Sequence, residues 1–131
     1  MIAPIPGLLA VVADDDGVIR RLLTMMLERQ GFSVLVAEDG QHALHHIRAG
    51  RPSVVFLDAH MPGIDGYEVC RRIRAEAQQP EPTVFMLTAG GQDSDRRRAT
   101  AAGVNEFMTK PFSPSKLGAR LQELIAAGAA S

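Results

Sequence analysis

The stretch Leu8-Leu9-Ala10-Val11-Val12-Ala13, which runs directly into Asp14-Asp15-Asp16, decides the fold class. Six apolar residues in a row, without polar alternation, are typical of a strand that is buried on both faces. Segment 18–30 then carries apolar residues at helical spacing, and Gly31 stops it. A buried strand followed by an amphipathic helix is the unit from which parallel sheets are built.

The same alternation of strand and helix continues to the end of the chain. Further strands are predicted at 33–37, 54–57, 83–87 and 106–108, and further helices after Asp39 up to Gly50, at 67–77, at about 93–102 and from Ser113-Pro114 onward. Asp39 and Ser113 are expected N-caps, Asp16 is expected at the entry of the first helix, and Gly90-Gly91 is expected to be a flexible connection. Five strands alternating with five helices predict a doubly wound α/β fold, whose parallel sheet is covered on both faces.

Length and composition indicate one compact domain. The chain has 131 residues, of which 46% are hydrophobic and 22% are charged. We place the domain at 8–127, between an N-terminal tail at 1–7 and a C-terminal tail at 128–131. The net charge of −1 and the absence of Trp argue against direct nucleic-acid binding.

Two further features concern the cellular compartment. Cys70 is the only cysteine, so the chain can form neither an internal disulfide nor a multi-cysteine zinc site. The first apolar run is too short to span a bilayer, and no basic residue precedes it as in a signal peptide. We interpret the protein as cytoplasmic and soluble, without membrane association.

Residues that can carry chemistry follow four of the predicted strands. Asp14-Asp15-Asp16 follows the first strand, Asp58 the third, Thr88 the fourth and Lys110-Pro111 the fifth. In an open parallel sheet, ligands bind beyond the carboxyl ends of the strands. The sequence therefore predicts that carboxylates, a hydroxyl and an ammonium group meet at one edge of the sheet.

This set of groups fits phosphoryl chemistry assisted by a metal ion. Clustered carboxylates repel one another, and a hard divalent cation such as Mg²⁺, or Mn²⁺, would supply the opposing charge. A carboxylate beside such an ion can act as a nucleophile and form an acyl phosphate, which assigns this role to Asp58. Lys110 and the Thr88 hydroxyl could then bind phosphoryl oxygens.

Four pieces of sequence carry a resemblance to a known family. They are Val11-Val12-Ala13-Asp14-Asp15-Asp16 with Arg20 following, Leu57-Asp58-Ala59-His60-Met61-Pro62-Gly63-Ile64-Asp65-Gly66, Leu87-Thr88-Ala89, and Thr109-Lys110-Pro111-Phe112. Together they resemble the receiver domain of two-component response regulators, and the resemblance covers nearly the whole chain, about 8–127.

The resemblance implies a flavodoxin-like sheet with strand order 2-1-3-4-5. It implies that Asp58 accepts a phosphoryl group from a sensor histidine kinase or a histidine phosphotransfer protein, and that a downstream effector protein or domain reads the change. The protein would be a phosphorylatable signalling domain and not an enzyme. Its implied metal ligands are Asp14, Asp15, Asp58 and the backbone carbonyl of His60, and Pro111 is expected to follow a cis peptide bond.

Four positions bear on how such a switch would work in this chain. The switch position on the fifth strand is Phe107, which keeps the aromatic ring but lacks the tyrosine hydroxyl found in many relatives. His60 and Gly90 would flank the acyl phosphate and tune its lifetime, and we expect loss of the phosphoryl group within minutes. Lys116 stands where regulators that dimerise through this face often carry an acid, so we expect a monomer or a weak dimer.

Other motifs have alternative readings. His42, His45 and His46 could form a metal site, because His42 and His46 lie one helical turn apart, although a solvated helix face is the simpler interpretation. Two groups of arginines could mark a nucleic-acid surface, but nearby acids favour solvated faces; they are Arg71, Arg72 and Arg74, and Arg96 to Arg98.

Two other functions are alternatives, and the second of them uses a similar fold. A Mg²⁺-dependent aspartyl phosphohydrolase would need an acid two residues after its nucleophile, where this chain has His60. A flavin-binding electron carrier would need a phosphate-binding loop after the first strand, where three aspartates stand instead. The sequence names neither the kinase nor the signal, and the chain could be a stand-alone receiver or part of a longer regulator or hybrid kinase.

Overall fold

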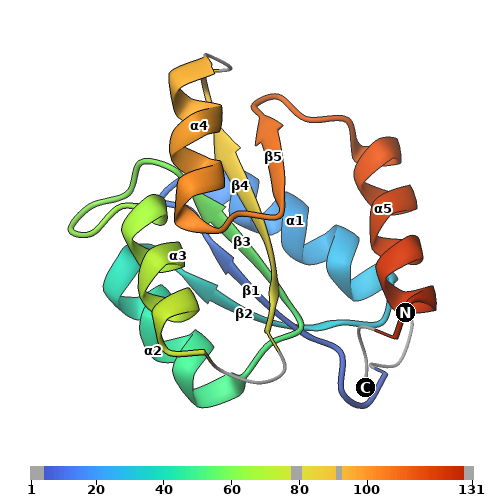
Figure 1. Cartoon of the computed structure of the whole chain (residues 1–131). Helices are drawn as coiled ribbons and strands as arrows, with labels where there is room; N and C mark the ends of the chain where they lie inside the picture. Colours follow the sequence, from blue (N-terminus) through green and yellow to red (C-terminus); the bar gives the residue numbers. More distant parts are fainter. Residues whose placement is uncertain (1–4, 78–80, 91–92, 129–131) are drawn as a thin grey trace.

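The sheet has the predicted architecture. The structure, a computed structural model, describes residues 5–77, 81–90 and 93–128 (Figure 1). Five parallel strands lie in the order β2-β1-β3-β4-β5. The strands are β1 (Leu9–Ala13), β2 (Ser33–Ala37), β3 (Val54–Asp58), β4 (Thr83–Thr88) and β5 (Glu106–Thr109), and the helices are α1 (Gly17–Arg29), α2 (Gly40–Gly50), α3 (Gly66–Ala75), α4 (Asp93–Ala102) and α5 (Pro114–Ala126). The doubly wound α/β prediction is confirmed.

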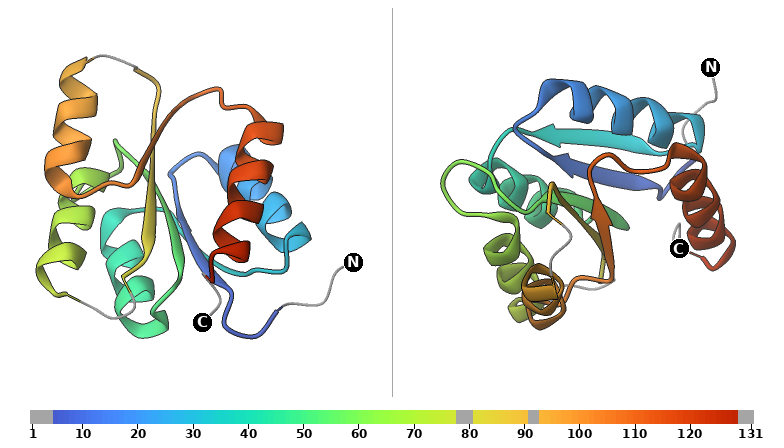
Figure 2. Two further views of the ribbon diagram at one scale, coloured as in Figure 1. Left: turned by 45° about the vertical axis from the view of Figure 1, so that its right-hand side comes forward. Right: turned by 90° about the horizontal axis from the view of Figure 1, so that it is seen from above.

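Helices cover the sheet on both faces. Helices α1 and α5 pack on one face, and α2, α3 and α4 pack on the other (Figures 1 and 2). Side chains of β1 and β3 alternate between two cores: Val11 and Val55 belong to one, whereas Val12 and Phe56 belong to the other. The central strands are therefore buried on both sides, which explains their unbroken apolar sequences.

Short polar side chains start the helices as the sequence predicts. Asp39 and Ser113 are the N-caps of α2 and α5, and Asp16 caps α1 by accepting a hydrogen bond from the Val18 backbone N–H. Each cap satisfies an amide that would otherwise lack a partner in the first helical turn. Asp16 thereby starts α1 directly after the end of β1.

Helix α2 ends at Gly50 as predicted, but the residue that caps it is Arg51. Gly50 still belongs to the helix, and Arg51 is the C-cap in the left-handed conformation, with φ of 48°. A Cβ on residue 50 would lie 2.9 Å from the Leu9 side chain, so the glycine allows α2 to approach β1 closely. Pro52 follows the cap and prevents the helix from continuing.

Two other expectations concern the Gly90-Gly91 connection and the absence of a membrane-spanning segment. Of the predicted Gly90-Gly91 connection, Gly91 lies outside the described residues. No helix in the part of the chain that the structure describes is both long and apolar enough to cross a membrane.

Candidate functional site

Three carboxylates meet where β1 and β3 end. Asp14 and Asp58 are buried, at 0% and 5% exposure, whereas Asp15 is exposed to solvent. One ligand atom from each of the three residues lies within 4.8 Å of the other two. The structure thus brings together the acidic triad that the sequence predicted from two separate strands.

The donor set of this triad fits a hard divalent cation. The Asp14 Oδ1 atom accepts a hydrogen bond of 2.9 Å from the Asp16 backbone N–H. The buried Asp14 Oδ2 atom faces Lys110, whose ammonium nitrogen lies 2.8 Å away. Each carboxylate oxygen can accept more than one contact, and the exposed Asp15 leaves room for water, so the triad offers the oxygen ligands that Mg²⁺ prefers.

Lys110 bridges the two buried carboxylates. Its Nζ atom lies 2.8 Å from Asp14 Oδ2 and 3.4 Å from Asp58 Oδ2. Burial alone would lower the pKa of Lys110, but its contacts with Asp14 and Asp58 outweigh this effect and raise the pKa above the usual lysine value. The ammonium group therefore stays charged and offsets part of the repulsion in the triad.

Asp58 is the electrostatically strained member of the triad. Burial of its carboxyl group and the nearby charge of Asp14 raise its pKa from 3.8 to about 6. A hydrogen bond of 3.2 Å from the His60 backbone N–H and the charge of Lys110 oppose this rise without cancelling it. The ionised form of such a carboxylate is stabilised when a cation or a reaction partner binds its oxygens.

Local sequence explains how Asp58 is held. It is the last residue of β3, and the next residue, Ala59, donates its backbone N–H to the Leu87 carbonyl of β4 at 2.8 Å. A Cβ on Gly66, the first residue of α3, would overlap the backbone carbonyl of Asp58. Only glycine permits α3 to begin so close behind this aspartate.

Thr88 and Lys110 are joined through the backbone at the ends of β4 and β5. The Lys110 backbone N–H donates to the Thr88 carbonyl at 2.8 Å. The Thr88 side chain is buried, and its hydroxyl oxygen accepts a hydrogen bond of 3.2 Å from the Gly90 backbone N–H. The hydroxyl proton is therefore available to an acceptor. The Lys110–Pro111 peptide bond is cis.

The remaining predicted residues lie around this centre. The His60 side chain is exposed, and the part of its carbonyl as a metal ligand stays a prediction. Phe107 is half-buried on β5, where the Arg96 guanidinium group from α4 lies 4.8 Å from its ring centre. The sequence did not predict this cation–π contact, because nothing in the local pattern links α4 to β5.

The predicted histidine and arginine groups contact other protein groups and do not form a second metal site among the described residues. His42 lies 3.7 Å from Asp39, and among the described residues the only cluster of three potential metal ligands is the acidic triad. Arg71 and Arg72 pair with Glu68, and Arg74 donates to the Gly103 and Pro82 carbonyls. Arg71 and Arg72 are thus paired with an acid on the helix surface, as the interpretation of a solvated face predicts. Arg74 has a structural role, because it donates to backbone carbonyls.

Arg98 is a residue that the sequence reading missed. It forms an ion pair of 3.0 Å with Asp65, the N-cap of α3, and its guanidinium group lies 4.2 Å from the ring centre of Tyr67. It therefore ties α4 to the start of α3, beside the loop that follows Asp58. In the sequence it is simply the third arginine of a surface run, so no local signal marks this role.

Comparison with known proteins identifies the family. The response regulator receiver domain model matches residues 10–122. The chain is 43% identical over 112 residues to a "probable transcriptional regulator ycf27" of Galdieria sulphuraria, which covers 86% of this chain and 43% of the relative. It is 39% identical over 115 residues to the transcriptional regulatory protein ResD of Bacillus subtilis, which covers 88% of this chain and 47% of the relative. The chain thus spans less than half the length of these curated relatives.

A solved receiver structure agrees with this chain in fold. The receiver domain of the sensor histidine kinase PA1611 from Pseudomonas aeruginosa, described with a magnesium ion coordinated in its active site cleft, superposes with a TM-score of 0.81 at 29% identity, covering 92% of this chain and 98% of that one. These matches favour the receiver prediction over the phosphohydrolase and flavin-carrier alternatives. The chain belongs to the response regulator receiver domain family, whose members are phosphorylatable signalling modules of two-component systems and not conventional enzymes.

Proposed function

We propose that this protein is a phosphorylation-controlled switch in which Asp58 accepts a phosphoryl group from a sensor histidine kinase or a histidine phosphotransfer protein. The observation that carries this proposal is the bridge of Lys110 between Asp14 and Asp58 beside the exposed Asp15. The chain holds a nucleophile, a cation and a candidate metal site within one small volume. A cytoplasmic location, where such donors act, is part of the proposal.

Each residue has a separate part in the transfer. An Asp58 carboxylate oxygen forms the bond to phosphorus as the phosphorus–nitrogen bond of the donor histidine breaks, and the imidazole leaves. The Lys110 ammonium group, already 3.4 Å from Asp58, pairs with a phosphoryl oxygen after little movement. The Thr88 hydroxyl, whose proton is available, donates to another phosphoryl oxygen.

Asp14, Asp15 and Asp58, with the His60 carbonyl, would hold Mg²⁺ or Mn²⁺. When bound, the ion would neutralise negative charge on the phosphoryl oxygens during transfer. His60 and Gly90 flank the site, and because Gly90 has no side chain to exclude water, we expect hydrolysis of the acyl phosphate within minutes.

The output of the switch is proposed to pass from Thr88 and Lys110 to Phe107. Phosphorylation gives both side chains a new partner, and their backbones are joined by a hydrogen bond at the ends of β4 and β5. A shift there biases the packing of Phe107 between α4 and the sheet. The reader is a partner protein or an attached domain. This domain does not itself bind nucleic acid or a membrane, and it is a monomer or a weak dimer.

Incubation with acetyl phosphate and Mg²⁺, followed by intact-mass measurement, tests the proposal. The wild-type protein is expected to gain one phosphoryl group, and Asp58→Asn or addition of a chelator should abolish the gain. Steady release of phosphate without a phosphorylated protein would instead indicate a phosphohydrolase.

A further inference from the structure

Arg20 on α1 contacts the backbone of Asp14, a member of the acidic triad. Its Nη1 atom donates a hydrogen bond of 2.7 Å to the Asp14 backbone carbonyl. Its side chain is only 20% exposed, and its Nη2 atom lies 3.8 Å from the Glu38 carboxylate. A hydrogen bond from a charged donor is stronger than one between neutral groups, so this contact restrains the turn between β1 and α1.

The same guanidinium group joins the ends of two neighbouring strands. Asp14 follows β1 and Glu38 follows β2, and the Asp14 backbone N–H donates to the carbonyl of Ala37, the last residue of β2, at 3.1 Å. Asp14 is thus held at its N–H by β2, at its carbonyl by Arg20 and at its Oδ1 atom by the Asp16 backbone N–H. These contacts define the direction in which its carboxylate points.

Arg20 and Lys110 hold Asp14 in different ways. Lys110 faces the Asp14 carboxylate, and in the proposed transfer its ammonium group pairs with a phosphoryl oxygen instead. Arg20 binds a backbone carbonyl that is not a ligand atom of the triad, so its contact can persist throughout the transfer. Arg20 therefore restrains Asp14 at the stage when Lys110 no longer does.

We propose that Arg20 is a positioning residue for the metal and phosphoryl site, which acts through the Asp14 carbonyl to keep the carboxylates of Asp14 and Asp15 directed toward Asp58. This inference rests on the proposed function, because it concerns the site in which Asp58 reacts. Groups that hold a metal ligand in place commonly change metal affinity by about ten- to a hundredfold. The positive charge of Arg20 also opposes the repulsion among the three carboxylates.

Calorimetric titration of the full chain with Mg²⁺ tests the proposal. Arg20→Met keeps an aliphatic side chain but removes the guanidinium group, so it should raise the Kd for Mg²⁺ by about tenfold or more. Arg20→Lys keeps a positive charge and a donor, so its Kd should lie between those of Arg20→Met and the wild type. At saturating Mg²⁺ the rate of phosphorylation of Arg20→Met by acetyl phosphate should approach the wild-type rate, because the loss is in metal affinity.

Amide hydrogen exchange provides a second readout, which needs no metal. In Arg20→Met the Asp14 backbone N–H, which donates to Ala37, should exchange faster than in the wild type. Amides in the middle of β1 should keep their protection, because the turn is loosened locally while the core stays closed. A purely structural role in the core would instead lower the protection of the whole strand.

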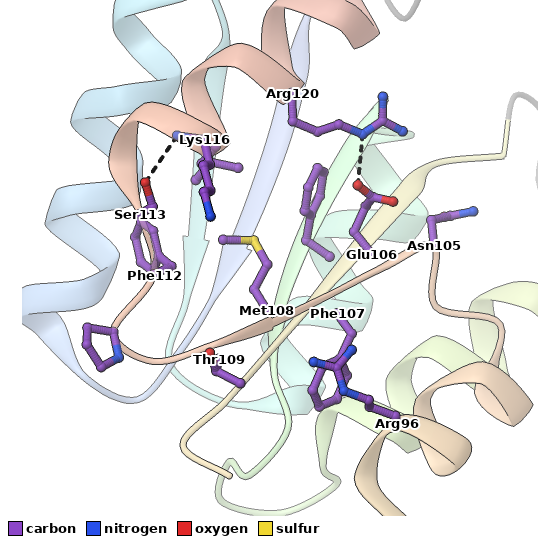
Figure 3. A pocket seen from close by; sticks show the side chains of 13 residues that line it. Arg96, Asn105, Glu106, Phe107, Met108, Thr109, Phe112, Ser113, Lys116 and Arg120 are labelled. Atoms are coloured by element: carbon purple, nitrogen blue, oxygen red, sulfur yellow. Dashed lines mark hydrogen bonds and ion pairs between the residues drawn. The ribbon is translucent and has the colours of Figure 1, made fainter. Parts of the chain in front are cut away.

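Two variants serve as matched controls. Arg120→Met also removes a guanidinium group that joins a helix to a strand, since Arg120 on α5 pairs at 2.8 Å with Glu106, at the end of β5 opposite to Lys110 (Figure 3). Arg21→Met removes the same charge from an exposed neighbouring position of α1. Both controls should bind Mg²⁺ with the wild-type Kd.

Three outcomes would overturn the inference: an unchanged Kd in Arg20→Met, an equal rise in Kd in Arg120→Met or Arg21→Met, and a Kd in Arg20→Lys as high as in Arg20→Met. Failure of the proposed function has a different signature. In that case the wild-type chain would bind Mg²⁺ more tightly than Arg20→Met but would not be phosphorylated by acetyl phosphate.

Discussion

Replacing Asp58 by Asn should stabilise the metal-free protein at neutral pH. The folded chain raises the pKa of this carboxyl group from 3.8 to about 6, chiefly by burial and then by the charge of Asp14. A proton affinity that differs by a factor of ten between the folded and unfolded states corresponds to about 1.36 kcal/mol, so the ionised Asp58 lowers the free energy of unfolding by up to about 3 kcal/mol. The neutral amide of Asn removes this penalty but also loses the ion pair with Lys110.

The contribution of Asp58 to the free energy of unfolding depends on pH, and the sign of this dependence follows from its raised pKa. Because the folded-state pKa lies above the unfolded value, the folded protein binds more protons than the unfolded chain between about pH 4 and pH 6. Stability from this group therefore falls as the pH rises through that window, and the penalty is complete above it. The advantage of Asp58→Asn should be near zero at pH 4 and largest at pH 7.5.

Urea unfolding in the presence of a chelator measures this difference. We expect a gain of about 1–3 kcal/mol at pH 7.5, which corresponds to a rise of several degrees in Tm for a domain of this size. Millimolar Mg²⁺ should reduce the difference in unfolding free energy between the variant and the wild type, because it binds the wild-type triad more tightly than that of the variant. Glu28→Gln, which neutralises an exposed carboxylate on α1, serves as the control. A variant no more stable than the wild type at pH 7.5, or a gain that is equally large at pH 4, would refute the electrostatic account.

Three further substitutions test other parts of the structure. Arg98→Ala removes an ion pair and a cation–π contact, so it should lower the free energy of unfolding by about 1 kcal/mol, whereas Arg97→Ala, at an exposed arginine, should change it little in the same urea titration. Gly66→Ala forces a Cβ against a backbone carbonyl and should cost about 1–3 kcal/mol, whereas Gly118→Ala, where a Cβ meets nothing within 4 Å, should stabilise α5 by about 0.5–1 kcal/mol; equal effects of the two would show that the close approach is unimportant. Asp15→Asn should weaken Mg²⁺ binding at least about tenfold by calorimetry, and an unchanged Kd would remove this residue from the metal site.

Much of the fold could be predicted because its signals are local. The apolar runs of β1 and β3 and the caps at Asp16, Asp39 and Ser113 each depend on a few neighbouring residues. The convergence of the acidic triad with Lys110 also followed from sequence, because parallel strands bring their carboxyl ends to one edge. Knowing which strand each residue ends was sufficient.

The features that escaped prediction depend on tertiary distance. The contact of Arg98 with Tyr67 joins two helices, and the contact of Arg96 with Phe107 joins a helix to the edge strand. The raised pKa of Asp58 depends on its depth of burial, which no sequence pattern reports. The C-cap at Arg51 was not predicted, because the sequence suggested that Gly50 only stops the helix. In the structure Gly50 instead allows α2 to pack closely against β1.

The central claim is that Asp58 is the residue that accepts the phosphoryl group, and borohydride trapping tests it most directly. The protein is incubated with acetyl phosphate and Mg²⁺, the acyl phosphate is reduced with borohydride to a homoserine side chain, and the modified position is located by peptide mass spectrometry. We predict reduction at residue 58 in the wild-type chain and none in a sample treated with a chelator. Reduction at Asp14 or Asp15 with residue 58 unmodified, or labelling that persists without a divalent metal, would contradict the account.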